Sequence, residues 1–136
     1  VVVALAIAAI AVAVVPIAAE RMLDGANYRG TVRDLMSAIR SARLAAMKSG
    51  EPAGFFFNTQ TQEFGVDGDT SGRLPSALSA ELRVASALIT PEGVAYIRFY
   101  PDGSSTGGSV ILRRADGSGV QLRVGWLLGR LSQHPV

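Results

Sequence analysis

The first nineteen residues of the chain, VVVALAIAAIAVAVVPIAA, contain no charged or hydrogen-bonding side chain. The first charge in the sequence is Glu20. An α-helix rises about 1.5 Å per residue, so a helix of this length spans roughly 28 Å, close to the thickness of a bilayer's hydrocarbon core. A helix that is apolar on every side is normally buried or membrane-embedded, because a surface helix is apolar on one side only. A chain that keeps this segment must therefore hide a whole helix from water.

Three interpretations of this segment remain open. Residues 1–19 form a helix in a membrane or in the core of a filament, a cleavable signal peptide that ends near Ala19, or a buried helix of a soluble domain. Pro16 removes one backbone donor, so we expect a kink there. No Met and no basic residue precede the run. Because signal peptides and membrane anchors usually carry basic residues at that place, we take Val1 as a processed or truncated start.

From Glu20 onward the pattern becomes amphipathic, and residues 20–50 are predicted to continue the same helix. Apolar residues recur on one face at helical spacing; they are Val32, Leu35, Met36, Ile39, Ala42, Ala46 and Met47. Gly50 and Pro52 are typical of a helix end. We therefore predict one helix from Val1 to about Ser49 whose second half needs a partner surface. The stripe is expected to pack on a β-sheet, and its candidates for contact with a partner helix are Val32, Leu35, Met36 and Ile39.

After Pro52 the sequence has the alternation and the turn residues of β-structure. Strands are predicted at residues 55–57, 62–66, 82–89, 94–100, 109–114 and 120–126, with a last short strand at 127–131. Residues 66–75, rich in Asp, Gly and Ser, are predicted to form a loop. The expected fold class is α+β, with one long helix packed on an antiparallel sheet or sandwich. The expected division is a membrane or filament-core segment 1–19, an amphipathic segment 20–50 and a β head domain 51–136.

The sequence offers little for catalysis or metal binding. It contains no cysteine and a single histidine, His134, which lies close to the chain end where chains usually fray. A Ser-His-Asp triad is not expected there. Residues 67–72 have a faint likeness to a calcium loop but lack the closing Glu of an EF-hand. We therefore predict no catalytic residue, no metal and no cofactor.

The stretch FYPDGSSTGGSVIL, residues 99–112, invites comparison with phosphate-binding loops. It has no lysine, and a strand rather than a helix follows it, so it does not fit such a loop. Proline fixes φ and glycine allows a positive φ, so a tight structural corner between strands is predicted instead. The residues that would form this corner are Pro101, Asp102, Gly103, Gly107 and Gly108.

Charge is distributed unevenly along the chain. Residues 51–97 are acidic on balance and both flanking regions are basic, which would suit head-to-tail contacts, although ordinary charge scatter explains it equally well. A small basic patch is a further candidate feature, because residues across a hairpin can meet. Its members would be Arg113, Arg114, Arg123 and Arg130. Solvated strand edges are the alternative interpretation.

Three segments resemble the type IV pilin-like proteins, and within them the GspH/FimT group. VVVALAIAAIAVAVVP is similar to the pilin N-terminal helix, with Pro16 at a proline those helices commonly carry. RDLMSAIRSARLAAMKSG is similar to the group's helix after the membrane span. IRFYPDGSSTGGSVILRR, followed after a hairpin by VGWLLGRL, is similar to its C-terminal signature. The resemblance covers nearly the whole chain, and the Pro-Asp-Gly turn is its most specific part.

The resemblance implies a minor pseudopilin of a type II secretion system, a non-enzymatic subunit near the tip of a periplasmic pseudopilus. Expected partners are other minor and major pseudopilins through the N-terminal helix, the inner membrane before assembly, and exported proteins, with no small-molecule substrate. The expected location is the bacterial inner membrane, single-pass, with the C-terminal head in the periplasm. A basic leader, its cleavage site and the N-methylated residue of the family would all precede Val1.

Two other functions compete with this one. The second candidate is a FimT-like minor pilin of a type IV pilus that binds DNA in natural transformation. DNA-binding pilins of the group carry several basic residues around the C-terminal Gly-Arg, whereas Gly129-Arg130 is followed here by Leu131-Ser132-Gln133. DNA affinity grows with the number of phosphate contacts, so DNA is disfavoured as a partner. The third candidate is a secreted β-domain whose first nineteen residues are removed.

Overall fold

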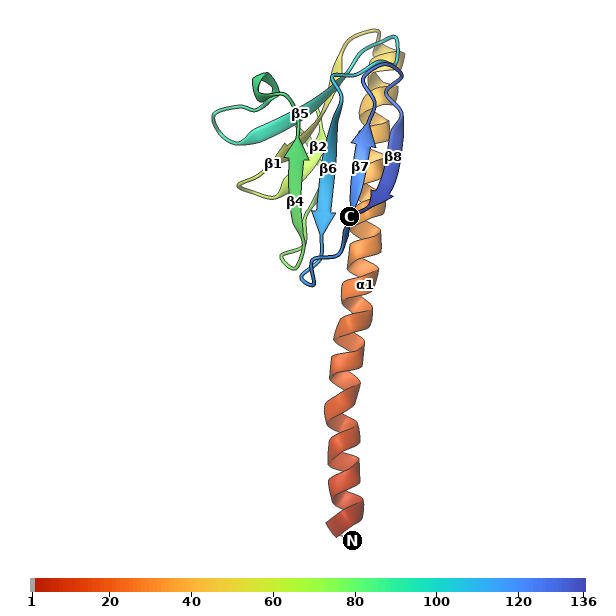
Figure 1. Cartoon of the computed structure of the whole chain (residues 1–136), viewed down its shortest axis with the longest axis vertical. Coiled ribbons are helices and arrows are strands. Elements are labelled where there is room, and N and C mark those ends of the chain that lie inside the picture. The colour runs from red at the N-terminus through yellow and green to blue at the C-terminus, as the bar shows by residue number, and fades with distance from the viewer. Residues whose placement is uncertain (1) are drawn as a thin grey trace.

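The computed structural model describes the backbone of residues 2–136 and the side chains of residues 25–136. Helix α1 (Val2–Ser49) is one continuous helix. Its C-terminal part lies along the head, and the remainder extends away from the head (Figure 1). Gly50 ends the helix at a φ of +72°, as predicted, and its N–H donates to Ala46 O at 3.1 Å. Across the described side chains, no helical stretch is long and apolar enough to cross a membrane. The side chains of the predicted segment 1–19 lie outside those residues. The backbone of α1 runs through Pro16 as a single helix, so proline does not interrupt the helix there.

The head consists of two antiparallel sheets of four strands each over residues 53–135. The first has the order β3-β2-β1-β5 and the second the order β4-β6-β7-β8. The first contains β1 (Ala53–Asn58), β2 (Glu63–Val66), β3 (Asp69–Arg73) and β5 (Val94–Phe99). The second contains β4 (Ser79–Arg83), β6 (Gly108–Arg113), β7 (Gly119–Val124) and β8 (Leu131–Pro135). Helix α1 contacts all four strands of the first sheet, and β8 of the second. The predicted α+β class, with a helix on antiparallel sheets, is confirmed.

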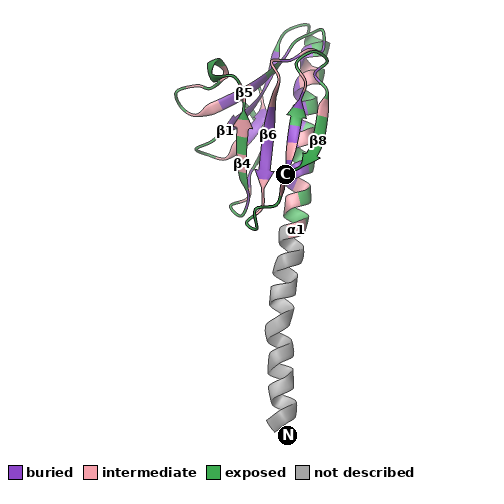
Figure 2. Cartoon of the chain, in the orientation of Figure 1, coloured by how far each residue is buried: buried purple, intermediate pink, exposed green. Residues whose placement is uncertain are grey.

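One hydrophobic core joins the helix to both sheets. The helix contributes its predicted stripe except Met47, β1 contributes Phe55 and Phe57, and β6 contributes Val110 and Leu112. Met47 was predicted to belong to the stripe but is 48% exposed, because it lies on the last turn of α1 beyond the cover of the sheets. Figure 2 shows the buried residues concentrated on β6, on β7 and where α1 meets the head. Every second residue of β5 and β7 is buried, so one face of each strand points into the core. These residues are Ala95, Ile97, Phe99, Val120, Leu122 and Val124.

The predicted loop at residues 66–75 is wrong, because β3 (Asp69–Arg73) lies inside it and pairs with β2. The sequence DTSGR carries no apolar residue, and four of its five residues are exposed. An edge strand with both faces in water has no alternating apolar pattern to reveal it. Its backbone pairing with β2 is what makes it a strand.

Two further strand predictions also need correction. The predicted strand 82–89 is replaced by β4, which ends at Arg83, and by a 3₁₀ turn at Ser86–Leu88. The predicted strand 127–131 is replaced by a turn at 126–128 followed by β8. His134 therefore lies in a strand, paired with Gln121 of β7, and not in a frayed tail. Pairing with a neighbouring strand orders this mostly exposed segment.

Candidate functional site

The Pro-Asp-Gly stretch forms the corner at which the chain passes from the first sheet to the second. It follows β5 and precedes β6, as predicted. The Asp102 carboxylate accepts hydrogen bonds from the Ser104 backbone N–H at 2.9 Å and from Ser104 Oγ at 2.6 Å. Gly103 has a φ of +88°, and its N–H donates to Tyr100 O at 2.9 Å. Side-chain caps and a left-handed glycine thus close a tight turn.

The second half of the corner is fastened to the segment after β7, which we call the C-terminal loop (residues 125–130). Ser105 is buried, its N–H donates to Trp126 O at 2.8 Å, and its Oγ donates to Gly125 O at 2.8 Å. The N–H of Gly107 donates to Ser105 Oγ at 3.0 Å. Ser105 therefore links the corner to the C-terminal loop through both its backbone N–H and its hydroxyl.

The corner also joins the C-terminal loop to the helix. Arg43 Nε, on α1, donates to Gly103 O at 3.4 Å. Gly129 has a φ of +61°, and a methyl group added to it would overlap Gly103 O and approach the Arg43 side chain. Three segments that are far apart in sequence meet at this point, and they leave no room for a side chain at Gly129.

The four helix residues predicted to contact a partner helix lie against the chain's own head. Val32, Leu35 and Ile39 are buried in the core, and Met36 packs against it. A partner that contacts this part of α1 in the folded chain therefore meets the exposed side of the helix. That side includes Arg33, Ser37 and Arg40.

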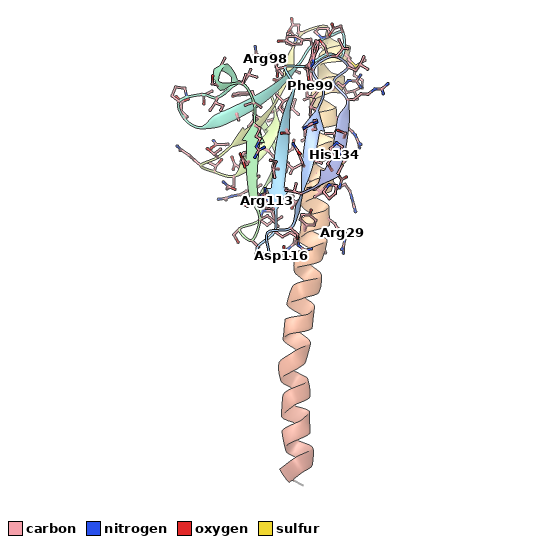
Figure 3. All side chains as sticks on the ribbon, in the orientation of Figure 1. Arg29, Arg98, Phe99, Arg113, Asp116 and His134 are labelled. Atoms are coloured by element: carbon pink, nitrogen blue, oxygen red, sulfur yellow. The ribbon has the colours of Figure 1, made fainter. Side chains whose placement is uncertain are left out.

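The predicted basic patch is wrong in its grouping. In the β6–β7 hairpin Arg113 pairs with Gly119, whereas Arg123 pairs with Ser109, which places the two arginines four residues apart along the ladder, or roughly 13 Å. Arg114 lies over the ring of Tyr28, with its guanidinium carbon 5.0 Å from the ring centroid. Arg130 lies in the C-terminal loop. Figure 3 shows Arg113 and Asp116 at the end of the head opposite Arg98 and Phe99.

Sequence reasoning missed the residues that complete the site. Arg43 was unremarkable on a helix with several arginines, and Ser105 was one small residue among six. The signal that could have found Gly129 is its position between two leucines and an arginine, where glycine suggests a positive φ. Within residues 25–136 no group of three or more His, Cys, Asp or Glu side chains could hold a metal ion.

Comparison with known proteins identifies the family. The model of the family described as Type II transport protein GspH matches residues 31–128, more than half of the 136 residues. The chain belongs to the GspH family. The match begins at Thr31, the first buried residue of α1 among the described side chains, and ends inside the C-terminal loop. The GspH family match therefore covers the part of the helix that packs on the head, together with the corner.

Individual relatives of this GspH-family chain agree with the assignment. Type II secretion system protein H of Xanthomonas campestris pv. campestris is 28% identical over 114 residues, covering 84% of this chain and 67% of that protein. The minor pseudopilin EpsH of Vibrio cholerae aligns with a TM-score of 0.60 at 10% identity, covering 80% of this chain and 97% of EpsH. The type IV minor pilin FimU of Pseudomonas aeruginosa aligns with a TM-score of 0.57 at 15% identity, covering 79% of this chain and 88% of FimU. At these identities the two structures show a shared fold.

The ionised carboxylate of Asp102 in the corner is expected to stabilise the fold at neutral pH but not in acid. The Ser104 hydroxyl, and then its backbone N–H, lower the pKa of Asp102 below the ordinary value of 3.8. A carboxyl group with a lowered folded-state pKa stabilises the fold above its unfolded pKa, and this contribution disappears as the pH falls through the folded value. We expect Asp102→Asn to lower the urea midpoint at neutral pH, and the difference from the unsubstituted chain to shrink below about pH 4.

Asp116 is a second aspartate in the same arrangement, and the variants at the corner leave it unchanged. Its pKa is lowered by the same arrangement, with Ser118 Oγ as the first donor. Ser104→Ala removes the hydroxyl that donates to Asp102. Like Asp102→Asn, it should make the urea midpoint less dependent on pH. A midpoint difference that stays constant from neutral to acidic pH would show that the ionised Asp102 does not stabilise the corner.

Proposed function

We propose that this GspH-family chain is a minor pseudopilin of a type II secretion system, located at or near the tip of a periplasmic pseudopilus. The family match over residues 31–128 carries the proposal. It is supported by an architecture in which a small β head is built on the C-terminal part of a helix that continues beyond it (Figure 1). The Xanthomonas relative is itself named as a type II secretion protein.

The apolar composition of residues 1–19 supports a subunit that moves from a membrane into a filament. An apolar helix satisfies its own backbone hydrogen bonds, so it is stable among lipid tails and also among the helices of a filament. Burial of large apolar side chains favours both environments, so the difference between them can be small. We propose that the chain is stored in the inner membrane with its head in the periplasm, and is then extracted into the pseudopilus with other pseudopilins. Its role is structural, without catalysis.

Deletion of the gene tests the function directly. We expect exported proteins to accumulate in the periplasm and to be lost from the culture medium, because assembly of the pseudopilus would lack one of its subunits. The measurement is the share of a secreted enzyme in medium and periplasm, with the full-length gene restored as the control. Normal secretion by the deletion strain would overturn the proposal.

Fractionation tests the membrane part separately. We expect the full-length chain to stay with inner membranes and to require detergent for extraction, since residues 1–19 have no polar side chain. Material that is water-soluble and monomeric with residues 1–19 still attached would contradict the proposed anchoring.

A minor pilin of a type IV pilus that binds DNA is the second candidate. The shared fold with the type IV minor pilin FimU is consistent with a pilus subunit. The C-terminal loop and β8 contain one arginine, Arg130. Because salt-dependent affinity grows with the number of neutralised phosphates, we expect no retention of duplex DNA at physiological salt. An electrophoretic shift assay over a salt series is the measurement, and tight binding would favour this second candidate.

A further inference from the structure

Exposed apolar side chains gather at the end of the head where α1 stops. Among residues 25–136, eight large apolar side chains are exposed, and five of them lie on two neighbouring segments. Leu44 (52% exposed) and Met47 (48%) lie on the last turns of α1, and Trp126 (68%), Leu127 (64%) and Leu128 (52%) lie on the C-terminal loop. Concentrated exposed apolar surface is typical of a binding site, whereas single exposed residues are ordinary.

A groove of about 410 Å³ separates α1 from the C-terminal loop. Its apolar lining includes Leu44, Met47 and Leu131, and its charged lining is Arg40, Arg43 and Arg130. The contact of Gly103 with Arg43 and Gly129 holds the loop beside the helix. We call this the arginine groove. The corner is therefore an element that fixes the shape of the arginine groove.

The three arginines have no carboxylate partner within the described side chains, where the one ion pair is Arg83 with Glu81. An apolar groove lined by three guanidinium groups without carboxylate partners is complementary to an apolar side chain flanked by carboxylates. Arginine is among the residues most often found at binding hot spots. Charge complementarity therefore specifies the chemistry of the occupant.

The position of the groove on the helix argues against a lipid surface as the occupant. Met47 lies 28 residues after Ala19, which is about 42 Å along a helix. A duplex DNA backbone is also a poor match, because it presents phosphates without apolar groups, whereas the groove has an apolar lining. A protein segment can supply both an apolar side chain for the apolar lining and carboxylates for the arginines.

We propose that the arginine groove docks an acidic segment of a neighbouring pseudopilin, with an apolar side chain inserted between Met47 and Leu131 and carboxylates paired with Arg40 and Arg130. This inference rests on the proposed function and extends it by naming the contact surface. The contact lies on the head, separate from the contacts of residues 1–19. It would give the assembly a specific neighbour, which uniform apolar helices cannot select.

Site-specific photocrosslinking of the full-length chain in cells tests the docking. A photoreactive phenylalanine analogue replaces Leu44 or Met47, which both line the groove and are exposed, and each other pseudopilin of the same system carries an epitope tag in turn. We expect an adduct with one tagged pseudopilin from both positions. Ile89 is the matched control, because it is 47% exposed and follows a 3₁₀ turn on the side of the head away from α1 (Figure 1).

Charge reversal tests the chemistry of the partner. Arg40→Glu combined with Arg130→Glu should lower the adduct yield about tenfold, while Arg73→Glu on β3 should leave it unchanged. Exchanging the partner's carboxylates near the adduct for lysine should restore the yield. Adducts only with a second copy of this chain, adducts with DNA, equal yields at Ile89, or yields unaffected by charge reversal would each overturn the proposal.

The deletion experiment separates this inference from the proposed function. If the deletion strain fails to secrete but no groove adduct forms, the function stands and the docking surface is wrong. If the deletion strain secretes normally, the proposed function is wrong whatever the adducts show.

Discussion

Leu35→Asp is expected to unfold the head. Leu35 is fully buried on α1, in the same core cluster as Phe55 and Phe57. Truncating a buried leucine costs about 2–5 kcal/mol, and a carboxylate without a partner in an apolar core adds a further penalty. The sum is comparable with the whole stability of a typical domain, about 5–15 kcal/mol. The measurement is thermal unfolding of the full-length chain in detergent, followed by circular dichroism, together with the protease resistance of the head.

Ser37→Asp is the matched control for this substitution. It places the same charge two residues away on the same helix, at an exposed position. Surface substitutions usually change stability by less than about 0.5 kcal/mol, so its unfolding curve should overlap that of the unsubstituted chain. Unchanged melting of Leu35→Asp would show that the stripe on α1 does not hold the head together. Melting of both variants at a lower temperature would point to a general effect of negative charge on the helix.

Gly129→Ala is expected to cost about 3 kcal/mol and to displace the C-terminal loop. Part of the cost is the left-handed backbone, about 1–2 kcal/mol for a residue with a Cβ. The remainder comes from overlap of the new methyl group with Gly103 O, which forces the corner away from Arg43. Urea unfolding measures the cost. The fluorescence of Trp126, the single tryptophan of the chain, reports whether the loop moves in the folded state.

Gly117→Ala separates the two contributions. Gly117 also has a positive φ, +89°, but no atom lies within 4 Å of the position that its Cβ would occupy. We expect it to lose only the backbone part, about 1–2 kcal/mol, with no change in tryptophan emission. Equal losses for the two variants would mean that the Gly103–Gly129 contact contributes nothing to the fold.

Much of the fold could be predicted because burial leaves a periodic pattern in the sequence. The stripe on α1 follows helical spacing, and β5 and β7 alternate between buried and more exposed residues. Edge strands lack this signal. All residues of β8 after Leu131 are exposed, so only its pairing with β7 makes it a strand, and pairing cannot be read from one segment alone.

One part of the candidate site could likewise be predicted from the sequence, and another part could not. The Pro101-Asp102-Gly103 turn was predictable because its conformation is set by the local properties of proline, aspartate and glycine. The distribution of the arginines was not, because it depends on the register between β6 and β7 and on the path of the chain after β7. The arginine groove needs Arg43 and Gly129 to meet, and no local pattern records a contact between residues so far apart in sequence.

The continuity of α1 has a mechanical consequence. The helix has no break between Val2 and Ser49. The same helix therefore forms both the shaft, meaning the part that extends beyond the head, and one side of the hydrophobic core. A force applied along the shaft is carried by backbone hydrogen bonds directly to Leu35 and Ile39, without passing through a linker. Pulling or pushing on the shaft therefore moves the head together with the helix. Separating the head from the helix would require removing these side chains from between the helix and the sheets.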